Sequence, residues 1–318
     1  MLDRLAQLDP AAWDTGLSPE NARACWQAAL SCVTPEALTG PVSGTRPDAV
    51  LIVCSGNVFT APLEWMLLLA ARGVRVIVKP ASGQEAAVRA MAACIPGVEV
   101  REWQGGDVEA EAAAMREVRG VVAFGGSEAL AAIAKRIPPG VVYLPFGPRF
   151  GVAVVQRPTR DVVIDHALYD GRGCMSPAAV FARESDLDEL AAWMAEAQAK
   201  WPRGPLSPAE AAGIRARIIL ARAVGEKRVG DGWGVLRMPL AQFHPEALPR
   251  VLVVYPFADV EEVRAAVAPW RSQLGTVASD LPGVFLGAPR MCAPGRMQFP
   301  GAGRRHDGVD VLAELWKG

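Results

Sequence analysis

A single cysteine stands in a turn-forming stretch, Tyr-Asp-Gly-Arg-Gly-Cys-Met-Ser-Pro, at residues 169–177. Gly171 and Gly173 precede Cys174, and glycine lets the backbone adopt positive φ and approach a bound molecule closely. Pro177 stops a helix from running through the stretch. The pattern predicts a thiol on a tight turn between a helix and a strand, which is how a nucleophile is presented. A buried structural cysteine fits the same pattern, because free cysteine is among the most buried residue types.

Three further groups of polar or glycine residues follow apolar runs, and each has two interpretations. Asn57 is either a turn residue or an amide donor for a developing oxyanion. Lys79, in a Lys-Pro-Ala-Ser stretch that ends at Ser82, is either a solvated charge or a ligand for ribose or phosphate. The turn Gly125-Gly126-Ser127 is either an ordinary helix cap or an anion site at a helix N-terminus.

Short apolar runs alternate with helical segments through the first half of the chain. The runs are 49–54, 74–78, 98–102 and 120–124, and the helical segments are 62–72, 83–93, 108–118 and 128–137. This alternation predicts a doubly wound parallel sheet, covered on both faces, with ligands at the carboxyl ends of the strands. A second α/β unit follows, so we expect a dinucleotide-binding domain over 1–157 and a cysteine-bearing catalytic domain over 158–318. The chain contains no Gly-x-Gly-x-x-Gly, so a dinucleotide would bind without that motif.

The composition narrows the class of protein. The chain has 318 residues, 51% of them hydrophobic and 21% charged, with a formal net charge of -1, which predicts a globular protein without the basic footprint of nucleic-acid binding. The six cysteines show no metal-ligand spacing and there are only three histidines, so we expect no metal site and a reducing, cytoplasmic setting. No apolar run is long enough to predict a membrane span, and the charges within residues 1–9, followed by Pro10, do not predict a secretory signal.

The order of these motifs along the chain resembles that of the aldehyde dehydrogenase superfamily. An Asn-bearing loop, a Lys-Pro loop, a Phe-x-Gly-Ser turn, a Gly-x-Cys nucleophile and a Glu before a valine-rich strand follow one another. Here they are Asn57, Lys79-Pro80, Phe124 to Ser127, Gly173-Cys174, and Glu246 ahead of 251–255. The resemblance covers roughly residues 48–318 and implies two aldehyde dehydrogenase-type domains, with a shortened N-terminus.

Other segments resemble the acyl-CoA and long-chain acyl-protein thioester reductases, the branch that includes the bacterial luminescence fatty acid reductase. They are Ser-Gly-Asn-Val at 55–58, Cys-Met-Ser-Pro at 174–177, Leu-Gly-Thr-Val at 274–277, and the terminal Gly-Arg-Met-Gln-Phe-Pro with His306-Asp307-Gly308. The terminal element is the most specific, because ordinary aldehyde dehydrogenases do not share it.

Two departures from the wider superfamily bear on the reaction. Pro145 stands where ordinary aldehyde dehydrogenases have a glutamate base that activates water, which favours exchange with a thiol over hydrolysis. Ser82 stands where the Lys-Pro-x-Glu loop places an acid against the adenosine ribose. The loss of that acid, with Lys79 nearby, favours NADP(H) over NAD(H).

The resemblance implies a mechanism. Cys174 attacks an acyl-CoA or acyl-carrier thioester, and the Asn57 amide with the Cys174 N–H holds the oxyanion. Reduction by NADPH then releases an aldehyde, and Lys79, Ser82, Gly125, Gly126, Ser127 and Glu246 bind the cofactor. Two alternatives stay open, namely an acyl-phosphate reductase with the same cysteine chemistry and a non-catalytic nucleotide-binding relative. A homo-oligomer or an acyl-transferring partner also stays open, as do the acyl chain length and the direction of the reaction.

Four residues near these motifs receive secondary assignments. Arg172 is a candidate for lowering the pKa of the Cys174 thiol. We expect His306 to fix the C-terminal segment by a hydrogen bond, and its alternative role is that of a general acid. Asp165 and Asp170 are expected to be solvated at a helix end.

Overall fold

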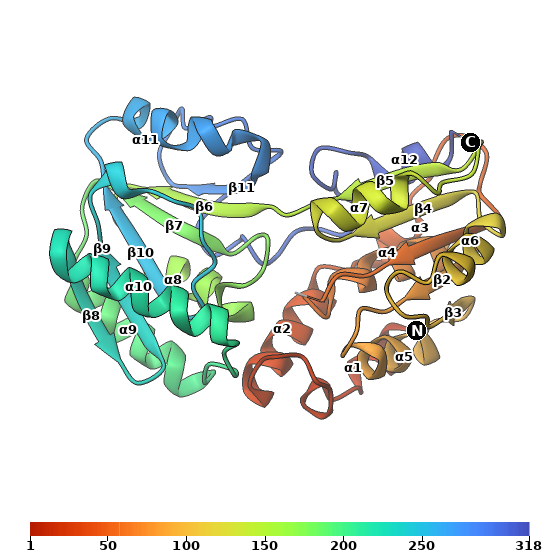
Figure 1. Cartoon of the computed structure of the whole chain (residues 1–318), viewed down its shortest axis with the longest axis horizontal. Helices are drawn as coiled ribbons and strands as arrows, with labels where there is room; N and C mark the ends of the chain where they lie inside the picture. Colours follow the sequence, from red (N-terminus) through yellow and green to blue (C-terminus); the bar gives the residue numbers. More distant parts are fainter. Residues whose placement is uncertain (57, 318) are drawn as a thin grey trace. The chain divides into compact units, whose positions relative to one another are not determined.

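The computed structural model describes residues 1–56 and 58–317 and divides the chain into two compact units (Figure 1). The first unit comprises residues 1–15, 26–148 and 300–318, and the second comprises 16–25 and 149–299. This division lies between Pro148 and Arg149, whereas the sequence pattern placed the boundary after Arg157. The reason is that strand β6 (Phe150–Val155) pairs with strands of the second sheet.

The first unit is built on a five-stranded sheet in which every pair of neighbours is parallel. Its order is β3-β2-β1-β4-β5, with β1 Ala49–Val53, β2 Arg75–Lys79, β3 Val98–Val100, β4 Gly120–Phe124 and β5 Val142–Phe146. Leu51 and Ile52 point to opposite faces of β1, and both are fully buried. The sheet is therefore covered on both faces, which explains why its strands are continuous apolar runs.

Helices connect these strands, as a parallel sheet requires. They are α4 Ala61–Ala70, α5 Glu85–Cys94, α6 Val108–Arg116 and α7 Ser127–Ala134, with the shorter α1 Leu2–Ala6, η1 Pro10–Ala12 and α3 Pro35–Thr39 near the start of the chain. Helix α4 is apolar almost throughout and is buried on most of its surface. Gly73, with φ of 73°, supplies the left-handed residue that turns the chain from α4 into β2.

The C-terminal helix α12 (Val311–Leu315) belongs to the first unit. A Cβ added to Gly120 would lie 2.3 Å from a methyl carbon of Leu315. Glycine at the start of β4 therefore lets α12 pack closely against this sheet.

The second unit contains a seven-stranded sheet of order β12-β11-β6-β7-β10-β9-β8. The strands not yet given are β7 Pro177–Ala182, β8 Glu226–Gly230, β9 Trp233–Arg237, β10 Val251–Pro256, β11 Leu274–Ser279 and β12 Arg290–Cys292. All neighbours are parallel except β8 and β9, which form an antiparallel hairpin at one edge.

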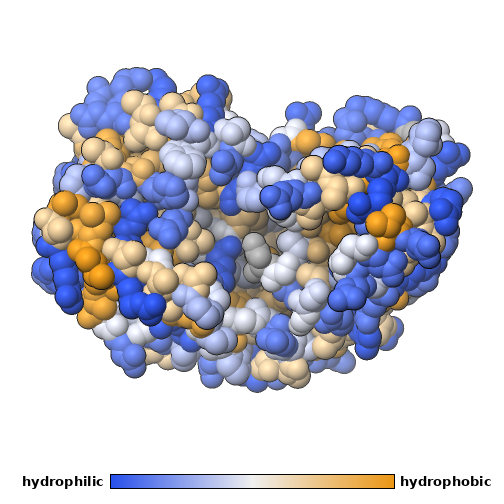
Figure 2. Space-filling model, viewed as in Figure 1, coloured by the Kyte–Doolittle hydropathy of each residue, from blue (hydrophilic) through white to orange (hydrophobic). Residues whose placement is uncertain are grey.

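Four helices cover this sheet in two layers. Helices α8 (Arg160–Ala167) and α9 (Leu187–Lys200) bury Val163 and Met194 against one face, and α10 (Pro208–Val224) and α11 (Val260–Val267) bury Ala221 and Val263 against the other. Three 3₁₀ turns complete the unit: η2 Leu168–Gly171, η3 Leu240–Gln242 and η4 Ala268–Gln273. Figure 2 shows apolar residues gathered at the edge where α10 and β8 lie.

Helix α2 (Pro19–Ser31) contributes to both units, because its residues up to Cys25 belong to the second and those from Trp26 belong to the first. Asn21 N–H donates to the Ser18 hydroxyl at 3.2 Å, which caps the start of the helix. The predicted α/β fold class, with parallel sheets in both units, is confirmed. The dinucleotide-binding and catalytic roles of the units stay predictions.

Candidate functional site

In the first unit, the segments that follow β1, β2 and β4 meet at one edge of the sheet, because these three strands are neighbours. The N–H of Cys54 donates to the carbonyl of Lys79 at 2.9 Å, and Gln84 Nε2 donates to the carbonyl of Gly56 at 2.7 Å. The side chain of Lys79 is half-buried at this edge, and Ser82 is exposed in the next turn. The predicted asparagine, Asn57, lies outside the described residues.

The turn after β4 leads directly into α7. Gly126 is the N-cap residue and its position carries no side-chain cap, so the first N–H groups of α7 are not satisfied by a capping side chain. Gly125 is half-buried, whereas Gly126 and Ser127 are exposed. Such a helix start donates hydrogen bonds to an anion and has the favourable end of the helix dipole.

His306 lies in an aromatic enclosure within the same unit. Its ring contacts those of Phe146, Phe124 and Trp65 edge-on, with centroids 4.4, 5.5 and 5.8 Å away. Its backbone N–H donates to Val309 and its carbonyl accepts from Val309, at 2.8 and 2.9 Å. This packing fits an anchor for the C-terminal segment.

Arg304 strengthens that attachment. Its Nη1 lies 2.5 Å from Glu64 Oε2, and the N–H of Gly303 donates to Glu64 Oε1 at 3.0 Å. Arg304 Nη2 is also 3.3 Å from Nδ1 of His306. The terminal motif is therefore tied to helix α4 of its own unit.

In the second unit, Cys174 is exposed just after an unusual turn. Tyr169, Asp170 and Gly171 adopt φ of 57°, 55° and 74°, three left-handed residues in succession. Two of them carry a Cβ, and each such residue costs about 1–2 kcal/mol. Gly171 has no room for a Cβ, which would lie 2.8 Å from the His166 ring. Strain of this kind persists only when surrounding contacts enforce it.

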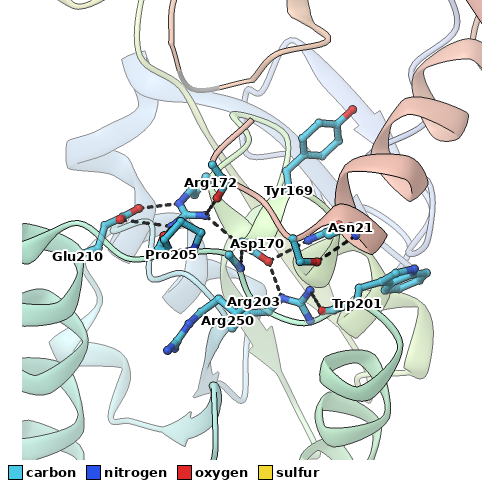
Figure 3. A network of polar contacts seen from close by, with 12 residues as sticks. Asn21, Tyr169, Asp170, Arg172, Trp201, Arg203, Pro205, Glu210 and Arg250 are labelled. Carbon is cyan, nitrogen blue, oxygen red and sulfur yellow. Dashed lines mark hydrogen bonds and ion pairs between the residues drawn. The ribbon is translucent and has the colours of Figure 1, made fainter. Parts of the chain in front are cut away.

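Asp170 is the centre of those contacts, and the expectation that it is solvated is wrong. Its carboxylate is fully buried and accepts four hydrogen bonds, because the turn directs it inward (Figure 3). The donors are Asn21 Nδ2 at 2.9 Å, Arg250 Nε at 2.8 Å, Arg172 Nη1 at 3.0 Å and the Gly204 N–H at 2.9 Å. We call Asn21, Asp170, Arg172, Glu210 and Arg250 the Asp170 cluster.

Arg172 completes the cluster by linking the turn to helix α10. Its Nε donates to Glu210 Oε1 at 2.6 Å, and its other nitrogens donate to the carbonyls of Gly16 and Pro205 at 3.1 and 2.7 Å. Two carboxylates thus share the charge of Arg172. These contacts give Arg172 a bracing role, and its expected effect on the Cys174 thiol stays a prediction.

Asp165 is also buried, contrary to expectation. Its two oxygens accept from the N–H groups of Gly295 and Met297, at 2.6 and 3.1 Å. Burial raises the pKa of Asp165 to about 7, although these N–H donors act in the opposite direction. Gln298 Nε2 donates to the carbonyl of Asp165 and to the hydroxyl of Ser176, both at 2.8 Å. The Gln-Phe-Pro motif is therefore connected to the residues that follow Cys174.

Glu246 is held by the same helix that holds Arg172. Arg217 Nη2 lies 3.0 Å from Glu246 Oε2, and a Cβ on Gly213 would come within 2.9 Å of Oε1. Glu210 and Arg217 are seven residues apart on α10, about 10 Å or two turns, so they share one face of the helix. The cysteine turn and Glu246 are thereby attached to one face of α10.

The sequence patterns missed Asn21, Arg250 and Arg217. A fully buried asparagine within an amphipathic helix leaves little trace in a hydrophobic pattern, and Arg250 looks like a surface charge before a strand. Their importance arises from pairings between segments far apart in the chain.

The two α/β units, each built on a largely parallel sheet, have the aldehyde dehydrogenase fold. Solved structures agree. An NADP-dependent enzyme from E. coli superposes with a TM-score of 0.67 over 99% of this chain and 80% of that chain, at 14% identity. A benzaldehyde dehydrogenase from Corynebacterium glutamicum superposes with a TM-score of 0.63. The superposition covers 94% of this chain and 79% of that chain, also at 14% identity.

The chain belongs to the acyl-CoA reductase (LuxC) family, whose model matches residues 47–317. It is 24% identical over 218 residues to long-chain acyl-protein thioester reductase 2 of Photobacterium leiognathi and 25% identical over 223 residues to the thioester reductase of Photobacterium phosphoreum. These matches cover 61% and 62% of this chain but 45% and 44% of those proteins. The chain thus spans less than half the length of the curated relatives it matches.

Across the described part of the chain, no helix is both long and apolar enough to cross a membrane. Residues 1–56 and 58–317 also contain no group of three or more His, Cys, Asp or Glu side chains arranged to hold a metal ion.

Proposed function

We propose that this protein reduces an acyl thioester to an aldehyde, with Cys174 as the nucleophile and NADPH as the reductant. The observation that carries the proposal is the exposure of Cys174 three residues after a run of three left-handed residues, Tyr169 to Gly171. Backbone strain concentrates at functional sites, and an exposed thiol is unusual for a residue type that is mostly buried. Membership of the acyl-CoA reductase family supports the same chemistry.

The proposed reaction proceeds in two stages. The Cys174 thiolate attacks the acyl carbonyl, a carbon–sulfur bond to the enzyme forms, and the bond to CoA or to a carrier thiol breaks. The departing thiolate takes up a proton. The backbone N–H of Cys174, together with Asn57, would hold the negative oxygen during this exchange. NADPH, when bound, supplies the hydride that converts the enzyme thioester into the aldehyde and restores the thiolate.

The residues of the first unit fit a dinucleotide phosphate. The N-terminus of α7 carries no side-chain cap, and Gly126 has open space where a Cβ would stand. Gly125, Gly126 and Ser127 would bind phosphate there through backbone N–H groups. Lys79 would hold the adenosine ribose side, and Glu246, positioned by Arg217, would bind the nicotinamide ribose.

The choice of NADPH over NADH rests on Ser82 and Lys79. A 2′-phosphate is repelled by a carboxylate and attracted by an ammonium group. Ser82 is exposed and uncharged at the position where the superfamily pattern has an acid, and Lys79 is half-buried at the end of β2, the strand that leads into the Ser82 turn.

The test is NADPH oxidation by the purified protein with acyl-CoAs of increasing chain length, with NADH and Cys174→Ala as controls. We expect oxidation that requires Cys174, and the order of rates would identify the acyl group. In parallel, an acyl-CoA without cofactor should add one acyl group to Cys174, detected by mass spectrometry. Equal NADPH oxidation by Cys174→Ala would remove the nucleophile from the proposal. Turnover of an acyl phosphate, but of no thioester, would replace the substrate class.

A further inference from the structure

The left-handed turn before Cys174 needs an external restraint. Tyr169 and Asp170 both carry a Cβ, and both occupy a region of φ that such residues disfavour. Only Gly173 separates the cysteine from Arg172, whose N–H donates to the carbonyl of Tyr169 at 2.9 Å. The direction of the thiol is therefore set by whatever holds residues 169–172.

Asp170 provides that restraint through both its side chain and its backbone. The carboxylate is fully buried and accepts from Asn21, Arg250, Arg172 and the backbone of Gly204, as described above. The carbonyl of Asp170 also accepts from the N–H of Arg250 at 3.2 Å. An ionised carboxylate has acceptor sites for all of these donors, whereas its amide counterpart has one acceptor oxygen and a donor group.

Further contacts that hold the turn come from the start of helix α2. Asn21 is fully buried, and its Nδ2 donates to the carbonyl of Ala167 at 3.1 Å as well as to Asp170. Cys25 Sγ accepts from the N–H of Tyr169 at 3.2 Å, and its carbonyl accepts from the Tyr169 hydroxyl at 3.2 Å. Residues 16–25 precede the 47–317 segment that the family model matches, yet they contact the turn directly.

We propose that Asp170, braced by Asn21 from helix α2, is a positioning residue that holds the left-handed 169–171 turn and thereby fixes the direction of the Cys174 thiol. The inference rests on the proposed function, because it takes Cys174 as the nucleophile. It assigns a role at the candidate active centre to Asn21, which lies outside the matched part of the chain.

The deciding variants are Asp170→Asn and Asn21→Ala. Asp170→Asn keeps the side-chain volume but replaces one carboxylate oxygen by an NH₂ group. That group cannot accept the two hydrogen bonds that the oxygen accepts in the wild type. Asn21→Ala leaves Asp170 its contacts with Arg172, Arg250 and Gly204 while it removes the contact with α2. Asp188→Asn is the matched control, since it weakens an exposed Asp–Arg pair in the same unit, with Arg228.

The first measurement separates kcat from KM. A displaced nucleophile slows the chemical step, so we expect kcat to fall ~100-fold in Asp170→Asn and ~10-fold in Asn21→Ala, for misplacements of an ångström or less. The KM for NADPH should change less than about threefold, because the cofactor contacts proposed above are untouched. The buried thiols of Cys54 and Cys94 should stay protected from iodoacetamide, which a generally loosened protein would not maintain.

The second measurement needs no turnover. Native-state hydrogen exchange of a peptide spanning 169–175 should accelerate at least ~10-fold in both variants and stay unchanged in Asp188→Asn. If the wild-type protein shows no turnover, the proposed function fails and this measurement alone decides the restraint. If Asp170→Asn does not fold, Asn21→Ala decides. Wild-type kcat in the deciding variant, or unchanged exchange at 169–175, would overturn the inference.

Discussion

Asp170 and Arg250 form an ion pair that is wholly buried, with Arg250 Nε 2.8 Å from Asp170 Oδ1. Arg250 also donates to the carbonyl of Trp201, and burial lowers the pKa of its guanidinium. Like Tyr169 and Asp170, Arg250 adopts a left-handed φ, of 60°. The pair thus joins two strained segments, the turn before Cys174 and the entry to β10.

Loss of one partner should destabilise the protein strongly. Arg250→Met leaves the Asp170 carboxylate buried with one cation fewer, so we expect the free energy of unfolding to fall by about 3–5 kcal/mol in urea titrations. Arg228→Met, which breaks the exposed pair with Asp188, should cost less than about 1 kcal/mol. An equal loss in the two variants would mean that the buried pair contributes no more than a surface one.

Gly213 offers a test in which stability and cofactor binding move in opposite directions. Alanine is favoured over glycine inside a helix by about 1 kcal/mol, so Gly213→Ala should stabilise α10. The new methyl group would lie 2.9 Å from Glu246 Oε1 and would displace that carboxylate from Arg217. We therefore expect a higher melting temperature together with a KM for NADPH raised several-fold. A stabilised variant with unchanged KM would argue against a cofactor role for Glu246.

Asp165 and His166 should have opposite effects on the pH dependence of stability. Burial raises the pKa of Asp165 to about 7 from its ordinary 3.8, and lowers that of His166 to about 4 from 6.5. Between about pH 4 and 7, native Asp165 keeps a proton that the unfolded chain has lost, so its contribution to stability falls as pH rises. Native His166 lacks a proton that the unfolded chain holds between about pH 4 and 6.5, so its contribution rises with pH.

The two slopes nearly cancel in the wild-type protein below pH 6.5, and a substitution should reveal one of them. Asp165→Asn leaves the slope of His166, so its stability should rise by about 1 kcal/mol per pH unit from pH 4 to 6.5. Urea titrations at half-unit intervals would measure this. A variant whose stability depends on pH in the same way as that of the wild type would show that Asp165 does not retain its proton in the native state.

The attachment of the C-terminal segment can be tested through Glu64. Glu64→Gln removes the charge that pairs with Arg304 and weakens the acceptor for the Gly303 N–H. We expect faster hydrogen exchange across residues 301–309 and a global loss of only about 1 kcal/mol, because the aromatic contacts of His306 remain. Exchange as slow as in the wild type would assign the attachment to the His306 packing alone.

The sequence was sufficient for the parts of the fold that depend on local patterns. The apolar runs around Leu51, Ile77 and Val121 predicted parallel strands, since a strand covered on both faces must be apolar throughout. Glycines and a proline mark the turn beside Cys174, which is why its placement on a turn was predicted; its role as the nucleophile stays a prediction. The roles of Asp170 and Asn21 were not predicted. Asp170 lies 80 residues from Arg250 and 149 residues from Asn21 in the chain, and no local spacing encodes such pairings. An aspartate in a turn is usually solvated, and only the three-dimensional structure shows that this one is buried.

The choice of cofactor can be tested by restoring the acid at position 82. Ser82 is exposed in the turn after β2, so a glutamate there is accommodated without repacking, and its carboxylate would repel a 2′-phosphate while it accepts hydrogen bonds from a ribose hydroxyl. We expect Ser82→Glu to lower kcat/KM for NADPH at least ~10-fold and to leave that for NADH equal or higher, an effect of about 1.4 kcal/mol. Ser82→Gln, which has a similar size without the charge, is the matched control and should retain most of the preference. Equal losses with the two cofactors would place the 2′-phosphate elsewhere, and Lys79→Met would then show whether the ammonium group alone determines the preference.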